Sequence, residues 1–275
     1  MSALDSILDA LRLEPDGPDR YRAPNVDLGH AVVFGGQLLA QSIVAARIGQ
    51  EEKLVKTLHT VFARGAAPDR PVEIEVDRMS AGRSIGTCAV TISQEGRLCT
   101  RSLVLLSAAE PDFIRHSDDH PTLPDLPPRP DRPLERGEWA IEVVGGVDIS
   151  DPDAVGPPEL DVWTCFPGAP EDAALDQALL SFPTDGFLIG AAMRPHAGVG
   201  QAQAHVTIST GVISHTLTFH DPCPAGDWFL MAQRSVHAGG GRAYGTAHVY
   251  RQDGRLAASF VQDSMIRPKT GSGSL

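Results

Sequence analysis

The sequence predicts an α+β fold in which two duplicated antiparallel sheets each wrap around a central helix. The chain has 275 residues, 42% of them hydrophobic, which is enough for one large domain or two small ones. The frame G-R-x-x-G-T, a β-rich run and Q-x-G-R-L occurs twice in the same order, so that Gly86 corresponds to Gly245 and Gly96 to Gly254. An apolar helical pattern precedes each copy. Together these observations indicate an internal duplication.

The expected elements follow in order along the chain. An amphipathic helix comes first, with one apolar face formed by Leu4, Ile7, Leu8 and Leu11. The segments "GGQLLAQSIVAARIG" (35–49) and "DGFLIGAAMRPHAG" (185–198) are the two central helices. "PVEIEVDRM", "SIGTCAVTIS" and "CTRSLVLLS" are β-rich, and "QEGRL" and "QDGRL" are turns between strands.

A proline-rich stretch divides the two copies. Its composition is typical of a linker or an extended surface crossing. We therefore expect a first unit at 1–110, a linker at 111–160, and a second unit at 161–275.

The charge and the cysteines limit the partners. The net charge of −12 disfavours nucleic acid and basic-patch binding to membranes, and no apolar window is long enough to span a bilayer. The N-terminus has acids and no basic segment, so a secretory signal is not expected. The four cysteines are scattered, and "HSDDH" (116–120) lies in the linker, where a solvated loop is expected. We expect a cytoplasmic protein without a metal or another cofactor.

The residues 82–86 match G-x-S-x-G, the nucleophile elbow of serine hydrolases. An elbow joins a strand to a helix, but the run after Ser84 is β-rich, and the second copy has Ala243 in place of Ser84. We therefore interpret Gly82 and Gly86 as turn or bulge positions with positive φ. An α/β-hydrolase esterase that uses Ser84 remains a disfavoured alternative.

Polar residues break the repeat at two positions. Aligning the helices places Asp185 opposite Gly36, and aligning the last strands places Gln262 opposite Val104. Asp185 alone fits a helix N-cap, and Gln262 alone fits either an edge-strand residue or a specific role. Their occurrence together in one copy favours a functional site in the second unit.

The chain resembles the acyl-CoA thioesterase II family, the double-hotdog thioesterases. The matching segments include "VFGGQLLAQSIVAA" (33–46), "LHTVFARG" (58–65), "LDQALL" (175–180), "SHTLTFHDP" (214–222) and "QDGRLAASFVQDSMIR" (252–267). The resemblance implies a double hotdog whose second hotdog carries an Asp, a Thr or Ser, and a Gln. These groups polarise a water molecule that attacks the thioester carbonyl of acyl-CoA.

Carried over by position, the acid is Asp185 and the amide is Gln262, whereas the hydroxyl position falls at Val212. We expect Ser214 to supply the hydroxyl from the same strand face, with Thr210 and Thr216 as alternatives. Gly36, Gly186 and His59 are the expected substrate-binding residues.

These roles make chemical sense. A carboxylate can accept the proton of the attacking water, and an amide and a hydroxyl can orient that water. The resemblance also implies a homo-oligomer with no cofactor. The main alternative is a degenerate double hotdog that binds acyl-CoA without hydrolysing it, which Val212 favours.

Overall fold

The computed structural model describes residues 2–120, 122–126 and 135–269. The first half contains α1 (Ala3–Ala10), β1 (Glu14–Pro15), β2 (Arg20–Ala23), α2 (Gly35–Arg47), β3 (Lys53–Phe62), β4 (Val72–Ala81), β5 (Ile85–Gln94) and β6 (Arg97–Ala108). The second half contains β7 (Ala140–Val143), the 3-10 turn η1 (Val144–Gly146), β8 (Glu159–Cys165), α3 (Ala173–Ser181), η2 (Phe182–Asp185), α4 (Leu188–Met193), η3 (Gln201–Gln203), β9 (Ile208–Phe219), β10 (Phe229–Gly239), β11 (Arg242–Arg251) and β12 (Leu256–Pro268).

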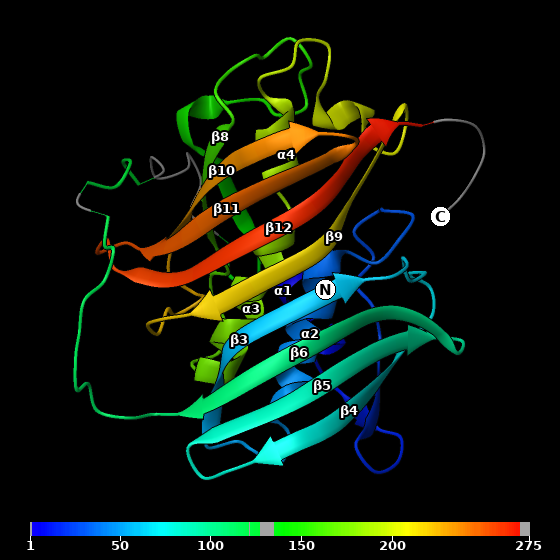
Figure 1. Cartoon of the computed structure of the whole chain (residues 1–275), viewed down its shortest axis with the longest axis vertical. Coiled ribbons are helices and arrows are strands. Elements are labelled where there is room, and N and C mark those ends of the chain that lie inside the picture. The colour runs from blue at the N-terminus through cyan, green and yellow to red at the C-terminus, as the bar shows by residue number, and fades with distance from the viewer. Residues whose placement is uncertain (1, 121, 127–134, 270–275) are drawn as a thin grey trace.

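The strands form one continuous sheet. Twelve strands of the described residues pair in the order β1-β2-β4-β5-β6-β3-β9-β12-β11-β10-β8-β7. Figure 1 shows the central part of this sheet, from β4 through β3 and β9 to β10. The predicted duplication is confirmed, and the two sheets are joined edge to edge where β3 pairs antiparallel with β9. Leu58 lies opposite Leu217 at this junction, and both side chains are fully buried. The two halves therefore share one core.

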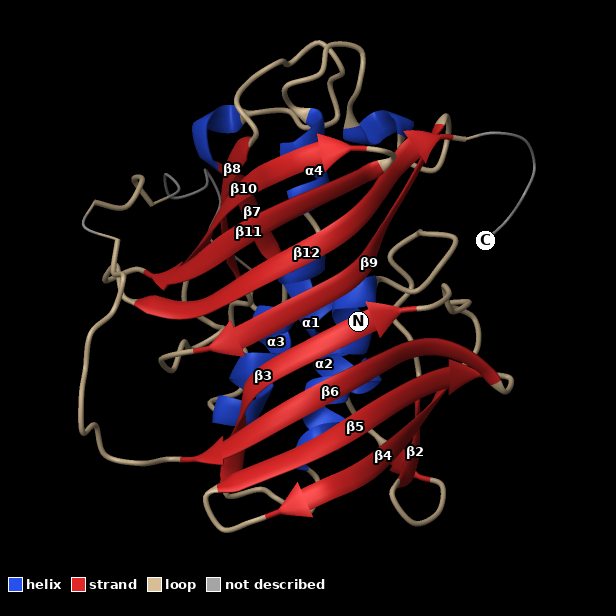
Figure 2. Ribbon diagram, viewed as in Figure 1, coloured by secondary structure: helices blue, strands red, loops and turns tan. Residues whose placement is uncertain are grey.

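The helices cover one face of this sheet, which we call the inner face (Figure 2). The predicted first central helix is confirmed as α2, whose Leu39 and Ile43 have no exposed surface. It ends at Arg47, and Gly49 follows with φ of 76°. Glycine reaches this left-handed conformation without the steric penalty of a side chain, which favours the stop.

The second central helix differs from the prediction of one continuous segment. The chain forms the 3-10 turn η2, which contains Pro183, and then the six-residue α4. Pro183 has no N–H for a helical hydrogen bond, so α3 cannot continue through it. α4 ends at Met193, two residues before Pro195, which also lacks an N–H. The break places Asp185 in a turn and not inside a helix.

The repeated glycines have a different cause from the one expected. Gly82 and Gly86 do not have positive φ, so that expectation is wrong. A Cβ on Gly86 would lie 2.1 Å from Oε1 of Gln50, and a Cβ on Gly245 would lie 2.8 Å from the side chain of Leu188. Both copies therefore have glycine at this position because a side chain, Gln50 in the first and Leu188 in the second, packs directly onto the strand.

The predicted turns between strands are confirmed. In the β5–β6 hairpin, the two turn residues Glu95 and Gly96 have φ of 54° and 72°. Two consecutive positive φ values are typical of the type I′ turn, whose twist matches that of paired strands.

The proline-rich segment expected as a linker also takes part in the fold. It contributes β7, which pairs with β8 at the edge of the sheet. Just before β7, Trp139 packs edge-on against Phe182, with ring centroids 5.2 Å apart. This segment therefore helps to hold η2, the turn that carries Asp185.

Candidate active site

Asp185 lies where the two halves meet. It is the last residue of η2, and α4 begins three residues later with Phe187 at the N-cap and no side-chain cap. Asp185 therefore does not cap the helix that follows it. Its carboxyl group instead faces the first turn of α2, since a Cβ on Gly35 would lie 2.6 Å from Asp185 Oδ2.

Gly36 makes this approach possible. A Cβ at Gly36 would lie 1.9 Å from the backbone oxygen of Phe182, so η2 and α2 touch through their backbones. The ring of Phe34 packs on that of Phe182 with centroids 5.1 Å apart. Gly36 thus lies beside Asp185, as expected, and the close contact alone explains why it is glycine.

The carboxyl group of Asp185 is poised to exchange a proton near neutral pH. Burial raises its pKa to about 7, although the backbone N–H groups of Gly36 and Gly35 favour the charged form and oppose the shift. The residue is half-buried, but its Oδ1 is buried and makes no hydrogen bond within the described part of the chain. A general base works best when its pKa lies close to the working pH.

Gln262 lies on the inner face of β12, opposite His215 of β9, and is 1% exposed. Its Nε2 donates to the backbone oxygen of Thr184 at 2.8 Å and to Nδ1 of His215 at 2.9 Å. The contact with Thr184 ties Gln262 to the residue directly before Asp185. Gln262 Oε1 is buried and has no partner among the described residues.

These contacts fix both the amide and the imidazole. The reversed amide would place Oε1 against the oxygen of Thr184, two acceptors facing each other, so Nε2 must be the donor to both groups. His215 Nδ1 is then an acceptor, so the imidazole carries its proton on Nε2. This Nε2–H donates to Thr184 Oγ1 at 3.2 Å. Thr184 Oγ1 in turn donates to the backbone oxygen of Ser181 at 2.6 Å.

His215 is therefore neutral. Burial lowers its pKa to about 3, and the charge of His59 adds to the effect. His215 and Thr184 were not among the site residues predicted from the sequence. The available signal was their position, because Thr184 directly precedes Asp185 and His215 lies in the motif "HTLTFH".

The hydroxyl predicted from β9 is misplaced. The register shifts between Asp263 and Ser264, so that Asp263 pairs with Ser214 while Ser264 pairs with Val212. This bulge at Ile213 reverses the alternation of faces. Val212 is on the inner face with Gln262, whereas Ser214 is on the opposite, outer face. The expectation that Ser214 shares the face of Val212 is wrong.

His59 and Thr216, two further residues expected in the site, also lie outside it. His59 is exposed on the outer face, where its Nδ1 lies 2.7 Å from Oγ1 of Thr216. Thr216 therefore also faces outward, and neither side chain points toward Gln262. Thr210 lies on the inner face, opposite Ile266.

Gly186 directly follows Asp185. Its backbone N–H donates to the oxygen of Pro183 at 3.0 Å and is not free to bind a substrate oxygen. Among the expected site residues, the structure thus brings Asp185, Gly36, Gly186 and Gln262 into one region of the inner face.

Ser84 lies in the turn between β4 and β5. Its backbone oxygen accepts a hydrogen bond from Ala108 N at 2.8 Å. A nucleophile elbow joins a strand to a helix, and this turn joins two strands. The interpretation of residues 82–86 as a strand turn is supported by this placement.

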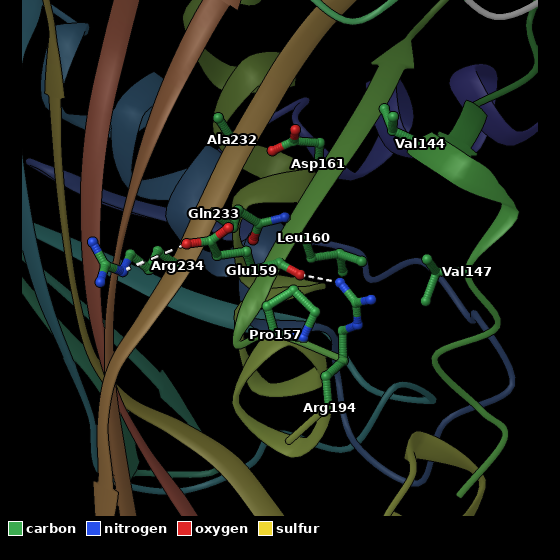
Figure 3. Close-up of a pocket in the computed structure, with 10 residues that line it drawn as sticks. All are labelled: Val144, Val147, Pro157, Glu159, Leu160, Asp161, Arg194, Ala232, Gln233 and Arg234. Carbon is green, nitrogen blue, oxygen red and sulfur yellow. Dashed lines mark hydrogen bonds and ion pairs between the residues drawn. The ribbon is translucent and has the colours of Figure 1, made fainter. Parts of the chain in front are cut away.

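A pocket of about 410 Å³ lies elsewhere, along β8 and β10 (Figure 3). Arg194 donates from Nη1 to the backbone oxygen of Glu159, and Arg234 Nε lies 3.8 Å from Glu159 Oε1. The residues that line the pocket do not include Asp185 or Gln262. It is separate from the candidate active site.

The thiols and potential metal ligands form no second centre in residues 2–120, 122–126 and 135–269. No group of three or more His, Cys, Asp or Glu side chains is placed there to hold a metal ion. The four cysteines are free and buried. Burial raises the pKa of Cys88 to about 11 and that of Cys223 to about 12, so these thiols are poor nucleophiles at neutral pH.

A duplicated antiparallel sheet whose inner face packs on central helices defines the double-hotdog class. Solved structures share this fold. A protein from Alicyclobacillus acidocaldarius described as having a hot dog fold is 20% identical, with a TM-score of 0.72 over 96% of this chain and 98% of that chain. The tesB protein of Mycobacterium avium subs paratuberculosis is 21% identical, with a TM-score of 0.81 over 97% of this chain and 100% of that chain.

Within this class, the chain belongs to the acyl-CoA thioesterase family. The family pattern described as the acyl-CoA thioesterase N-terminal domain matches residues 23–107, and the C-terminal domain pattern matches residues 117–266. Acyl-CoA thioesterase 2 of Haemophilus influenzae is 27% identical over 289 residues, covering 96% of this chain and 98% of that protein. The crystal structure of acyl-CoA thioesterase II TesB2 from Mycobacterium marinum is 26% identical, with a TM-score of 0.78 over 98% of this chain and 99% of that chain. The resemblance noted in the sequence is confirmed.

Proposed function

We propose that this protein is an acyl-CoA thioesterase in which a water molecule bound between Asp185 and Gln262 attacks the thioester carbonyl. One observation carries the proposal. Asp185 Oδ1 and Gln262 Oε1 are buried acceptors that have no partner in the described part of the chain, and the Gln262 amide is anchored to the residue next to Asp185. A water molecule that donates one hydrogen bond to each oxygen satisfies both.

The reaction follows from this arrangement. Asp185 as carboxylate accepts a proton from the water while the water oxygen bonds to the thioester carbon. The tetrahedral intermediate then breaks its carbon–sulfur bond, and the departing sulfur takes the proton from Asp185. The products are a free fatty acid and CoA, and no covalent enzyme intermediate or cofactor is required.

The start of α2 provides electrostatic support. The N-terminal end of a helix carries partial positive charge, and the N–H groups of Gly35 and Gly36 lie beside the Asp185 carboxyl group. Negative charge that develops on the carbonyl oxygen near this end is stabilised in the same way.

The test is thiol release from acyl-CoA substrates of increasing chain length. Asp185→Asn and Gln262→Ala should each lower kcat by orders of magnitude. Asp263→Asn is the matched control, because Asp263 is next to Gln262 but exposed on the outer face. Wild-type turnover in both site variants, with folding intact, would falsify the site.

The second candidate function is binding of acyl-CoA without hydrolysis. Val212 favours it, because it places a methyl group where the family resemblance implies a hydroxyl. This candidate predicts that a non-hydrolysable acyl-CoA analogue binds while no acyl-CoA releases thiol. Hydrolysis by the wild type that is lost in Asp185→Asn rules it out.

We also propose that the protein forms a homo-oligomer through the outer face of the sheet. Val61 of β3, Leu103 of β6 and Tyr244 of β11 lie on this face, with 45%, 52% and 40% of their surfaces exposed. Large apolar side chains that are exposed on an uncovered sheet face favour association. Light scattering should give a multiple of the chain mass for the wild type and a smaller species for Leu103→Asp. A monomeric wild type contradicts this proposal.

We propose a cytoplasmic enzyme of fatty acid metabolism. Free buried thiols support a reducing compartment, and the proposed product is a free fatty acid. Among the described residues no helix combines the length and apolar character needed to cross a bilayer. Fractionation of cells that express the protein from its own gene tests the location, and recovery in a membrane pellet contradicts it.

A further inference from the structure

We propose that Ser264 is the catalytic hydroxyl of this site, supplied by β12 instead of β9. This inference rests on the proposed function and identifies one more group that binds the attacking water. The hydroxyl expected from the sequence lies on the strand that contains Val212, whereas Ser264 lies on the neighbouring strand.

The strand register places Ser264 correctly. Ser264 pairs directly with Val212 on one side and with Ala243 on the other. Directly paired residues of antiparallel strands point to the same face, with Cβ atoms about 4.5–5.5 Å apart. The serine hydroxyl therefore projects from the inner face beside the position where β9 offers only the valine methyl groups.

Ser264 is also close to Gln262. The two residues are separated by one position on β12, so they share the inner face at a spacing of about 7 Å along the strand. Ser264 is 3% exposed and Gln262 is 1% exposed. In the proposed site, the attacking water lies between these two side chains.

The other hydroxyls are less suitable. Ser214 and Thr216 point to the outer face. Thr210 is on the inner face, but it pairs with Ile266, four residues beyond Gln262 and therefore about 13 Å along the sheet. Of the hydroxyls compared, Ser264 is the one on the correct face at the correct distance.

A hydroxyl at this position completes the water site. A water molecule has two hydrogens and two lone pairs. The hydrogens point to Asp185 Oδ1 and Gln262 Oε1, and the Ser264 hydroxyl donates to one lone pair. The remaining lone pair is then directed at the thioester carbon, which is the orientation that attack requires.

The test compares two serines on the same strand. Ser264→Ala should lower kcat about 10- to 100-fold with little change in KM, the loss expected for one hydrogen bond in the transition state. Ser259→Ala is the matched control, since Ser259 is on the outer face and its hydroxyl lies 2.9 Å from His220 Nε2. The control should keep the wild-type kcat.

A second variant separates chemistry from folding. Adding Val212→Thr to Ser264→Ala returns a hydroxyl to the same face and should recover most of the lost kcat. The inference is overturned if Ser264→Ala keeps the wild-type kcat in an assay where Asp185→Asn is inactive. That result would not contradict the proposed thioesterase function. If the wild type itself releases no thiol, both proposals fail.

Discussion

Nδ1 of His215 lies 2.9 Å from Nε2 of Gln262, and this contact determines which atom of the glutamine faces the proposed water. A neutral imidazole accepts a hydrogen bond here, and the backbone oxygen of Thr184 accepts the second one at 2.8 Å. Both hydrogens of the amide are thereby used. The carbonyl oxygen of Gln262 is left without a partner among the residues that the structure describes.

His215→Phe should therefore lower kcat about 10- to 100-fold, because one buried N–H of Gln262 loses its acceptor and the amide is no longer held. The new ring keeps the stacking on Phe260, whose centroid lies 5.3 Å from that of His215. His215 acts through Gln262, so the pH profile set by Asp185 should keep its midpoint. Steady-state kinetics across pH measure both quantities. A displaced midpoint would show that His215 itself exchanges protons in the reaction.

The rate should depend on the protonation of Asp185. Burial raises the pKa of its carboxyl group to about 7, and only the carboxylate accepts a proton from water. We expect kcat/KM to rise about tenfold per pH unit below this pKa and to level off above it. The loss of thioester absorbance follows the reaction at each pH. A flat profile at and below neutral pH would exclude Asp185 as the base.

Asp185→Asn should stabilise the fold at alkaline pH. In the unfolded chain the carboxyl group loses its proton near 3.8, but in the folded chain it keeps the proton up to about 7. The unfolded state therefore binds fewer protons across this window, and wild-type stability falls as pH rises through it. The asparagine variant avoids this loss, which is on the order of a few kcal/mol.

Urea unfolding of both proteins, at a pH near 4 and again near 8, measures this difference. The advantage of the variant should be small in acid and large in base. Equal differences at the two pH values would mean that the carboxyl group is not desolvated in the folded protein.

The two glycines at the start of α2 should respond differently to alanine. At Gly36 the new Cβ would lie 1.9 Å from a backbone oxygen, so the turn must move, and we expect destabilisation of about 1–3 kcal/mol. At Gly35 the new Cβ would lie 2.6 Å from Asp185 Oδ2, so the flexible Asp185 side chain must move. We therefore expect Gly35→Ala to lower kcat and to cost less stability than Gly36→Ala. Gly211→Ala is the control, since within the described residues its Cβ position has no neighbour within 4 Å other than the adjoining residues of the chain. Unfolding and kcat are measured on all three variants. Equal unfolding midpoints for Gly35→Ala and Gly36→Ala would contradict the expectation that Gly36→Ala is the less stable of the two.

Much of the fold follows from local sequence signals. The hairpin at Glu95 and Gly96 and the helix that begins at Gly35 are set by residue preferences that act over a few positions. The comparison of the two copies also singled out Asp185 and Gln262, because polar residues at buried positions need a specific reason.

The remainder depends on pairing between distant segments. The bulge at Ile213 moves Ser214 to the outer face, and nothing in the β9 sequence marks it, since the register is set by contact with β12. His59 and His215 align in sequence but lie on opposite faces of the sheet. Ser264 was not predicted for the same reason. It lies beside Val212 only because β12 pairs with β9, and this pairing cannot be read from either strand alone.

Asp185 belongs to one copy of the duplicated unit, and the N–H groups of Gly35 and Gly36 that lie beside its carboxyl group belong to the other. The chain thus resembles a dimer whose subunits have been joined and have diverged, one carrying Asp185 and Gln262 and the other carrying the helix end that faces Asp185. Gly36 and Val104 stand in the first copy where Asp185 and Gln262 stand in the second. The proposed site therefore draws on both copies, and neither copy expressed alone would contain it complete.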